Sequence, residues 1–145
     1  MYDHPATRFV AGFIGSPAMN MIPCTVERRA ANLALRLSDR HSIEIPADRT
    51  ARYADHVGKP MLFGIRPEHI TEKRAHVNAA QRDITEEVQV LEPMGVDTMV
   101  FLEIEGEEFC ARAAPHSVRP VGQPMAFTID MSHMHLIDPR TDRVV

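Results

Sequence analysis

The sequence predicts an all-β fold, a barrel or sandwich of about eight to nine short antiparallel strands. Apolar and polar residues alternate along many short segments, as they do in strands that bury one face. Turn-forming residues interrupt this pattern at residues 105–107, 120–122 and 138–139. The apolar residues that share a face in each segment are Leu33, Leu35 and Leu37; Ile43 and Ile45; Met61, Phe63 and Ile65; Ile84, Val88 and Val90; Val100, Leu102 and Ile104; Phe109, Ala111 and Ala113; and Met125, Phe127 and Ile129.

Three segments depart from this alternation. Residues 5–14 predict a short N-terminal helix, because a proline suits the first turn and the apolar residues share one helical face, up to Pro17. So short a helix is marginal alone, which indicates the end of a larger unit. Residues 50–57 predict a second short helix. The polar residues 71–83 are interpreted as a loop that connects two lobes of strands, one on each side of it.

Composition excludes several classes of protein. The 145 residues are 44% hydrophobic and 25% charged, which suits a packed globular core. The formal net charge of −4 argues against a nucleic-acid partner, because phosphate binding depends on clustered Lys and Arg. No apolar run approaches the roughly 20 residues that span a bilayer, and no secretory signal begins the chain. Cys24 and Cys110 form no C-x-x-C pair and are interpreted as reduced, buried thiols of a cytoplasmic protein.

No sequence motif supports catalysis. A phosphate-binding P-loop requires Gly-x-x-x-x-Gly-Lys-Ser/Thr. Pro60 follows the only Gly-Lys pair of this chain, and Tyr53 occupies the position of the first glycine. A Gly-x-Ser-x-Gly elbow is also missing from the sequence. We therefore predict no catalytic residue and no cofactor site in this chain.

His133 and His135 are of a residue type that binds metal ions. At positions i and i+2 of a strand they would point to the same side and offer two imidazoles to one ion. No third ligand of recognisable spacing accompanies them. We therefore predict no metal site, and we expect an exposed strand face with Met134 and Leu136 pointing inward.

The segment MLFGIRPEHI carries the most informative polar residues. Gly64 allows a close backbone approach within a strand, and Pro67 ends ladder pairing because it has no N–H. Arg66 and Glu68 would then be displayed at a strand end, with His69 beside them. One interpretation is an ordinary strand end with a surface salt bridge, which contributes little. The other is a polar contact with a partner domain, and the residues alone favour neither.

LFGIRPEHI and the opening YDHPATRFVAGFIGSPAMN together resemble the C-terminal region of the ATPase subunits of sugar-importing ABC transporters. The likeness is to the maltose and glycerol-3-phosphate importer type. VLEPMGVDTMV, with Glu92, Gly95 and Asp97, resembles a Glu-x-x-Gly-x-Asp/Glu strand-turn-strand of that family, and HMHLIDPRTDRVV resembles its closing strand. The resemblance covers essentially the whole chain. It implies an OB-fold-like barrel of the MOP/TOBE type in two lobes over residues 17–145, with residues 1–16 as the end of an upstream ATPase domain.

The resemblance also implies a regulatory and dimerisation domain that performs no catalysis. In the family, ATP and Mg are bound by the upstream domain, so no cofactor is expected here. The implied partners are its own ATPase domain, a second copy of the ATPase subunit, the membrane subunits through the ATPase and, in some members, a regulatory protein. The implied location is cytoplasmic, peripheral at the inner face of the cell membrane.

By this resemblance the interface and regulatory candidates are Arg8, Met21, Gly64, Arg66, Pro67, Glu68, His69, Glu92 and Gly95. Arg8 matches a junction position used in regulatory contact. Met21 stands where the maltose-type protein has an aromatic residue, which favours the glycerol-phosphate-like or general carbohydrate branch.

The alternative function is that of a small-ligand sensor. Related OB-type domains hold oxyanions such as molybdate at subunit interfaces, in sites that need convergent N–H groups with Lys, Ser or Arg. Arg66, Lys59 and Ser117 are the candidates for such a site in this sequence.

Overall fold

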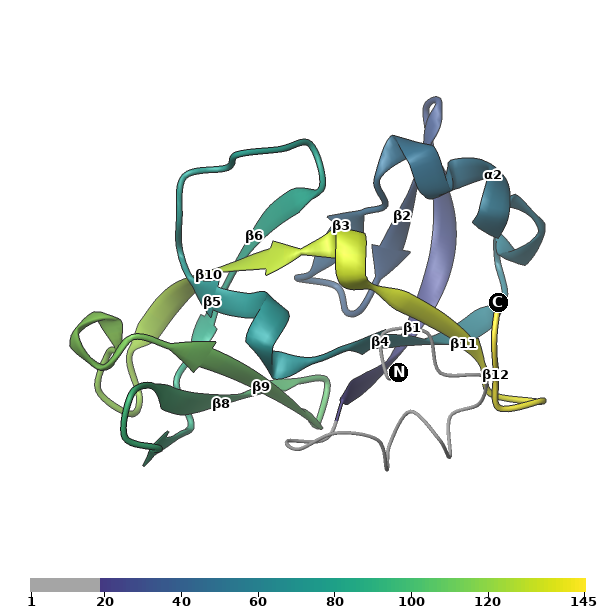
Figure 1. The fold of residues 1–145 in the computed structure, drawn as a ribbon. Helices are drawn as coiled ribbons and strands as arrows, with labels where there is room; N and C mark the ends of the chain where they lie inside the picture. Colours follow the sequence, from purple (N-terminus) through teal and green to yellow (C-terminus); the bar gives the residue numbers. More distant parts are fainter. Residues whose placement is uncertain (1–18) are drawn as a thin grey trace.

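The structure is a computed structural model that describes residues 19–145. The helix expected at residues 5–14 and the candidate Arg8 lie outside the described residues. The predicted all-β fold is confirmed, since strands dominate the described chain (Figure 1). The strands are β1 (Asn20–Arg29), β2 (Asn32–Arg36), β3 (Ser42–Glu44), β4 (Pro60–Ile65), β5 (Ile70–Glu72), β6 (Gln81–Glu87), β7 (Val90–Pro93), β8 (Thr98–Ile104), β9 (Glu107–Ala113), β10 (Pro124–Asp130), β11 (His135–Asp138) and β12 (Arg143–Val144).

The twelve strands within residues 19–145 exceed the predicted number. The surplus comes partly from β5 and β12, which are too short to display an alternating pattern. Helical turns are also short. The α-helix α2 (Thr50–Tyr53) lies between the 3-10 turns η1 (Ala47–Arg49) and η2 (Ala54–His56), which confirms the helix predicted at residues 50–57. The other 3-10 turns are η3 (Pro67–His69), η4 (Pro115–Ser117) and η5 (Met131–His133).

The strands form three sheets arranged in two lobes (Figure 1). Lobe 1 holds the six-stranded sheet β12-β11-β4-β1-β2-β3 and the helix α2. Lobe 2 holds the three-stranded sheets β5-β10-β6 and β7-β8-β9. The chain enters lobe 2 through η3 and returns to lobe 1 through η5, where β11 pairs with β4. Lobe 1 therefore contains both ends of the described chain, whereas the sequence pattern had placed its strands only before residue 70.

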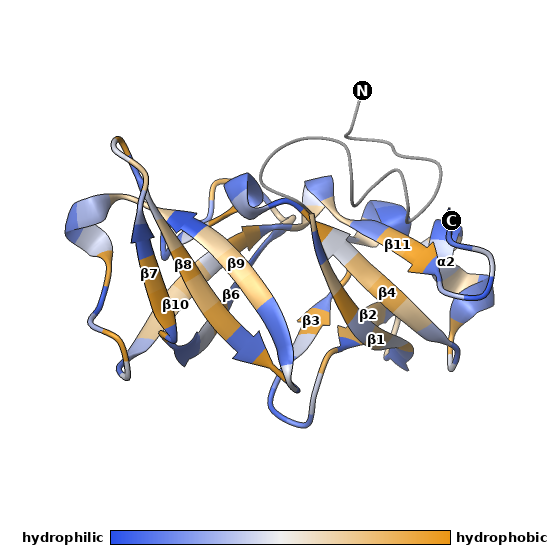
Figure 2. Cartoon of the chain, turned by 90° about the horizontal axis from the view of Figure 1, so that it is seen from below, coloured by the Kyte–Doolittle hydropathy of each residue, from blue (hydrophilic) through white to orange (hydrophobic). Residues whose placement is uncertain are grey.

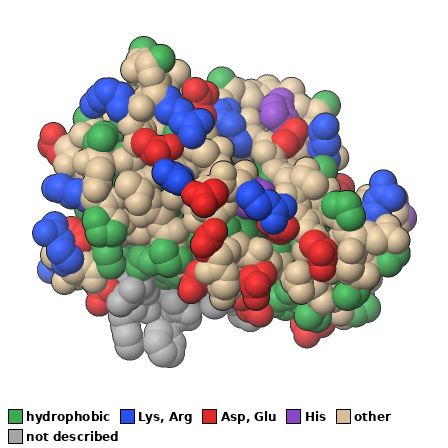
Figure 3. All heavy atoms as spheres, turned by 180° about the vertical axis from the view of Figure 1, so that it is seen from behind, with side chains coloured by type: hydrophobic (Ala, Val, Ile, Leu, Met, Phe, Trp, Pro, Cys, Tyr) green, Lys and Arg blue, Asp and Glu red, His purple; other side chains and the backbone are tan. Residues whose placement is uncertain are grey.

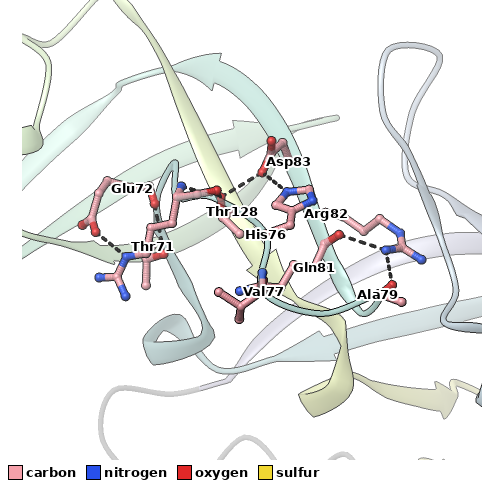
Figure 4. A network of polar contacts seen from close by, with 10 residues as sticks. Thr71, Glu72, His76, Val77, Ala79, Gln81, Arg82, Asp83 and Thr128 are labelled. Atoms are coloured by element: carbon pink, nitrogen blue, oxygen red, sulfur yellow. Dashed lines mark hydrogen bonds and ion pairs between the residues drawn. The ribbon is translucent and has the colours of Figure 1, made fainter.

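Residues 71–83 do not connect the lobes, and that prediction is wrong. β5 and β6 reach into this segment and pair on opposite sides of β10, so the segment lies within lobe 2. The intervening loop is held by polar contacts, drawn in Figure 4. His76 Nε2 lies 2.8 Å from Asp83 Oδ1, and the Thr128 hydroxyl donates to the same oxygen at 2.8 Å. Burial opposes ionisation of Asp83, but these hydrogen bonds prevail and its pKa is lowered.

One hydrophobic core extends through both lobes. The inward residues predicted from the alternation are buried, with a single exception in the segment ITEEVQV. Val90 is 53% exposed, whereas Glu86 is buried in the inward phase between Ile84 and Val88. The reason is that β6 ends and β7 begins within this segment, so the chain changes sheets. Figure 2 shows apolar stretches along the strands and mainly hydrophilic connections.

The surface carries charges of both signs. Lys and Arg side chains are interspersed with Asp and Glu on the face shown in Figure 3. Such a mixture gives no broad cationic field for a nucleic-acid backbone on this face.

Candidate functional site

The GIRPEHI segment forms the first crossing between the lobes. β4 ends at Ile65, and Pro67 opens the turn η3, which is closed by the His69 N–H donating to the Arg66 carbonyl at 3.0 Å. A Cβ atom added at Gly64 would lie 2.9 Å from the sulfur of Met19 and 3.2 Å from Cδ1 of Ile137. Both structural expectations are confirmed: a close approach at the glycine and an end of pairing at the proline.

Arg66 is not displayed at the surface, contrary to expectation. Its side chain is 2% exposed, because the strand end lies at the junction of the lobes, where η3 packs against β9. The Arg66 Nε atom lies 3.6 Å from Oε1 of Glu68, whose side chain is exposed. The His69 ring stacks on that of His133, with 3.7 Å between centroids and an angle of 2° between planes. Since His133 lies in η5, this stack connects the two crossings of the chain.

Asn20 joins the lobes through its side chain. Its Nδ2 donates to the Cys110 carbonyl at 2.9 Å, and its Oδ1 accepts from the Cys110 N–H at 2.8 Å. The amide thereby supplies the two bonds that a neighbouring strand would give to the edge strand β9. Both residues are buried, so water does not compete freely for these bonds. No sequence pattern predicted this contact.

A second polar contact between the lobes joins His41 to Glu86. His41 Nε2 lies 2.8 Å from Glu86 Oε2, and both side chains are largely buried. Arg40 adds an ion pair at 3.3 Å from Glu86 Oε1. Burial opposes ionisation of Glu86, but the hydrogen bond from His41 and the nearby charges prevail and lower its pKa. A glutamate at an inward position of the apolar alternation was the signal that could have indicated this buried contact.

An apolar groove brings Met21 and Glu92 together. The groove has a volume of about 430 Å³ and lies on the outward face of the β7-β8-β9 sheet, where β1 meets β9. In an antiparallel sheet with one buried face, the outward face is ordinarily polar. Here several methionine side chains lie beside the charged ones, and methionine suits adaptable contact surfaces. The lining includes Met19, Met21, Met94, Met99, Phe101 and Cys110, together with Asn20, Glu92, Glu108 and Arg112.

The β7–β8 turn forms one wall of this groove and extends its apolar surface. Gly95 takes a φ of +98° there, which favours glycine, and the Met94 N–H donates to the Asp97 carbonyl at 2.8 Å. Asp97 Oδ2 lies 3.4 Å from Arg112 Nε. Met94 and Val96 are 55% and 91% exposed. The Glu-x-x-Gly-x-Asp pattern thus shapes a projecting apolar turn beside the groove.

The two thiols are buried and free, as predicted. Burial raises the pKa of Cys24 to about 12, and burial, followed by the charge of Glu108, raises that of Cys110 to about 12. Both are therefore held as thiols at neutral pH, in which form they are poor nucleophiles.

His133 and His135 do not share an exposed strand face. His133 lies in η5 and His135 is buried in β11, although Met134 and Leu136 are buried as expected. Within residues 19–145, no group of three or more His, Cys, Asp or Glu side chains is arranged to hold a metal ion. In the same part of the chain, no helix has the length and hydrophobicity needed to cross a membrane.

The oxyanion candidates do not converge. Lys59 and Arg66 stand at opposite ends of β4, a separation of about 20 Å along an extended strand. Ser117 lies in η4 of lobe 2. The sequence-based alternative of a molybdate-type sensor is therefore less well supported than the importer domain.

Two family models match this chain. The MalK OB fold domain matches residues 15–70, and the TOBE domain matches residues 63–137. The two matches overlap at the first crossing between the lobes, so they divide the sequence where the chain passes from lobe 1 to lobe 2.

Curated relatives align with nearly the whole chain. The sn-glycerol-3-phosphate import ATP-binding protein UgpC of Chromohalobacter salexigens is 35% identical over 99% of this chain and 36% of that protein. The sulfoquinovosyl glycerol transport ATP-binding protein SmoE of Agrobacterium fabrum is 31% identical over 100% of this chain and 38% of that protein. UgpC of Ralstonia nicotianae is 35% identical over 99% of this chain and 38% of that protein. The chain thus spans little more than a third of these relatives.

Among solved structures, the cytoplasmic molybdate-binding protein ModG with molybdate bound has a similar fold. The TM-score is 0.58 at 18% sequence identity, over 83% of this chain and 96% of that chain. At this identity the likeness concerns the fold alone.

Proposed function

Since this chain belongs to the TOBE domain family, we propose that it is the regulatory and dimerisation domain of the ATP-binding subunit of a carbohydrate ABC importer. The transported compound would be a sugar or glycerol 3-phosphate. In this proposal residues 17–145 form the regulatory domain and residues 1–16 end the upstream ATPase domain. The complex would be cytoplasmic and peripheral at the inner face of the membrane.

The extent of the sequence likeness carries this proposal. Importer ATP-binding subunits align with 99–100% of the chain, yet the chain spans only 36–38% of their length. The remaining part of such a subunit would bind ATP and Mg, so the domain itself would perform no catalysis. Its proposed partners are that ATPase part, the membrane subunits through it, and a regulatory protein.

We place the proposed dimer contact at the apolar groove, with a second copy of this chain as its occupant. A twofold axis pairs a surface with itself, so a self-complementary patch is required. The lining carries both signs, Glu108 and Arg112, and in a related copy the Arg112 that pairs with Asp97 could also face the glutamate. The exposed Met94 and Val96 beside the groove supply the apolar contact area.

A domain exchange tests the proposed function. The region of the Chromohalobacter salexigens protein that aligns with this chain would be replaced by this chain, and import of sn-glycerol-3-phosphate measured in cells that lack the native subunit. We expect uptake well above that of a subunit truncated before the exchanged region. Uptake equal to that of the truncated subunit, with the chimera expressed and folded, would contradict the proposal.

Sedimentation velocity over a series of concentrations tests the dimer contact. We expect self-association of the chain, and at least tenfold weaker association in the Met94→Asp/Val96→Asp variant, because a buried unpaired carboxylate is costly. Val77→Asp is the control, since Val77 is 83% exposed in the β5–β6 loop and does not line the groove. A chain that stays monomeric at all concentrations, or equal loss in the control, would argue against this contact.

A further inference from the structure

A second groove, of about 500 Å³, lies on lobe 2 between the β5–β10 edge and the segment that contains η4. Of the candidate functional residues that the sequence predicted within residues 19–145, Ser117 alone lines it. Its lining includes two cationic side chains, Lys73 and Arg119, together with His116 and Ser117. The buried Met125 also belongs to the lining. The volume lies within the range of about 300–1,000 Å³ typical of small-molecule sites.

The backbone holds the two walls in place. On one side the Lys73 N–H donates to the Ala126 carbonyl at 3.1 Å, which extends the β5–β10 pairing to the lysine. On the other side the Ser117 N–H donates to the Ala114 carbonyl at 2.9 Å and closes η4. Glu72 connects the walls, because its Oε1 accepts from the Ala114 N–H at 2.9 Å. The side chains of the groove therefore project from a fixed frame.

The charge in the groove is unbalanced and positive. Among the described residues Glu72 is its only acidic lining residue, and its second oxygen accepts from Arg74 Nε at 2.6 Å. Burial opposes ionisation of Glu72, but its hydrogen bonds from Ala114 and Arg74 prevail and lower its pKa. Its negative charge is thus already engaged by these partners.

The charges of the two cations that line the groove, Lys73 and Arg119, are not paired in the way that the charge of Glu72 is. Within residues 19–145, the side chains of Lys73 and Arg119 make no hydrogen bond and no ion pair, and the same holds for the side chains of His116 and Ser117. Lys73 acts on Asp83 through space, but that carboxylate is bonded by His76 and Thr128. Cations that project into a cavity without an internal partner favour an anionic ligand.

We propose that this groove binds a small molecule that carries a phosphate group. Lys73 and Arg119 would bind phosphate oxygens by charge-assisted hydrogen bonds, and the Ser117 hydroxyl would donate a further one. Several donors around one group suit the three terminal oxygens of a phosphate monoester, whereas a carboxylate is satisfied by one arginine fork. Val118 and Ala126, which also line the groove, would offer the organic part of the ligand apolar contacts. This inference is independent of the proposed importer role.

Calorimetric titration of the whole chain tests the site. The probes are glucose 6-phosphate, inorganic phosphate and uncharged glucose. We expect saturable binding of one glucose 6-phosphate per chain, weaker binding of inorganic phosphate, and no binding of glucose. Replacing both cations in Lys73→Gln/Arg119→Gln should raise the Kd about 100-fold, as the loss of two charge-assisted contacts at roughly tenfold each.

The control variant is Lys59→Gln/Arg28→Gln, which removes the same charge from exposed positions of lobe 1. It should leave the Kd unchanged within about twofold, because screening weakens charges beyond the Debye length of about 10 Å. All four positions are exposed, so both variants should melt like the parent. Three outcomes would overturn the proposal: no saturable binding, equal weakening in both double variants, or binding to phosphatidic acid vesicles without binding to the soluble phosphates.

Discussion

Replacing Asn20 by alanine should weaken the contact between the two lobes. The wild-type amide forms two hydrogen bonds with the backbone of Cys110, at 2.9 and 2.8 Å, across 90 positions of sequence. Alanine removes both bonds and leaves a buried N–H and a buried C=O on the edge of β9. Each such group costs about 1–3 kcal/mol when it is buried without a partner.

The expected loss is therefore about 2–5 kcal/mol of the free energy of unfolding. The total free energy of unfolding of a domain of this kind is about 5–15 kcal/mol, so the expected loss is a large fraction of it. At about 3 °C or more per kcal/mol, the melting temperature should fall by roughly 10 °C. Water entering the space would bring the loss toward the lower limit by satisfying the groups of Cys110.

Urea unfolding followed by circular dichroism measures this loss. Asn32→Ala is the matched control, because the Asn32 amide reaches Glu44 at 3.4 Å in an exposed contact and should contribute under about 0.5 kcal/mol. An Asn20→Ala variant no less stable than this control would refute the assigned role of the amide.

Asn20→Asp separates the two bonds of this contact. At neutral pH its carboxylate would accept from the Cys110 N–H but face the Cys110 carbonyl, so the variant should be destabilised. Protonation restores a donor, which means that the folded state raises the pKa of this carboxyl. The recovered stability should be present below the unfolded pKa and lost as pH rises through the folded one. If the free energy of unfolding of Asn20→Asp did not rise on acidification relative to that of the wild type, the amide would not have the assigned role of donor.

Three further outcomes are expected. The folded state lowers the pKa of Glu86, so the stability that its carboxylate contributes is present above the unfolded value of 4.5 and is lost as pH falls through the folded value. The free energy of unfolding of Glu86→Gln should therefore fall less on acidification than that of the wild type. Parallel plots of stability against pH for the two proteins would contradict this. Gly64→Ala places a methyl group 2.9 Å from the Met19 sulfur and should lose about 1–3 kcal/mol in urea unfolding, whereas no loss would mean that the site expands freely. Cys24 and Cys110, with pKa values of about 12, should react with a thiol reagent at pH 8 only on unfolding, and rapid labelling of the native chain would show that the thiols are open to solvent.

The candidate site was only partly predictable. Gly64 predicted a close backbone approach and Pro67 predicted the end of strand pairing, because each effect follows from the residue type itself. The burial of Arg66 did not follow, since it depends on β9, which packs against η3 from far along the chain. Met21 and Glu92 were named as separate candidates, and their meeting in one groove required the tertiary structure.

The sequence by itself determined most of the strands that alternate regularly, together with their buried faces. Side chains i and i+2 of a strand share a face, so a buried face is written locally in the alternation of residues such as Leu33, Leu35 and Leu37. The tertiary structure alone decided which strands are neighbours. β11 pairs with β4, and Glu86 contacts His41 across 45 positions of sequence. Which strands pair depends on the packing of distant segments, and that packing produces no periodic pattern in the sequence of either segment.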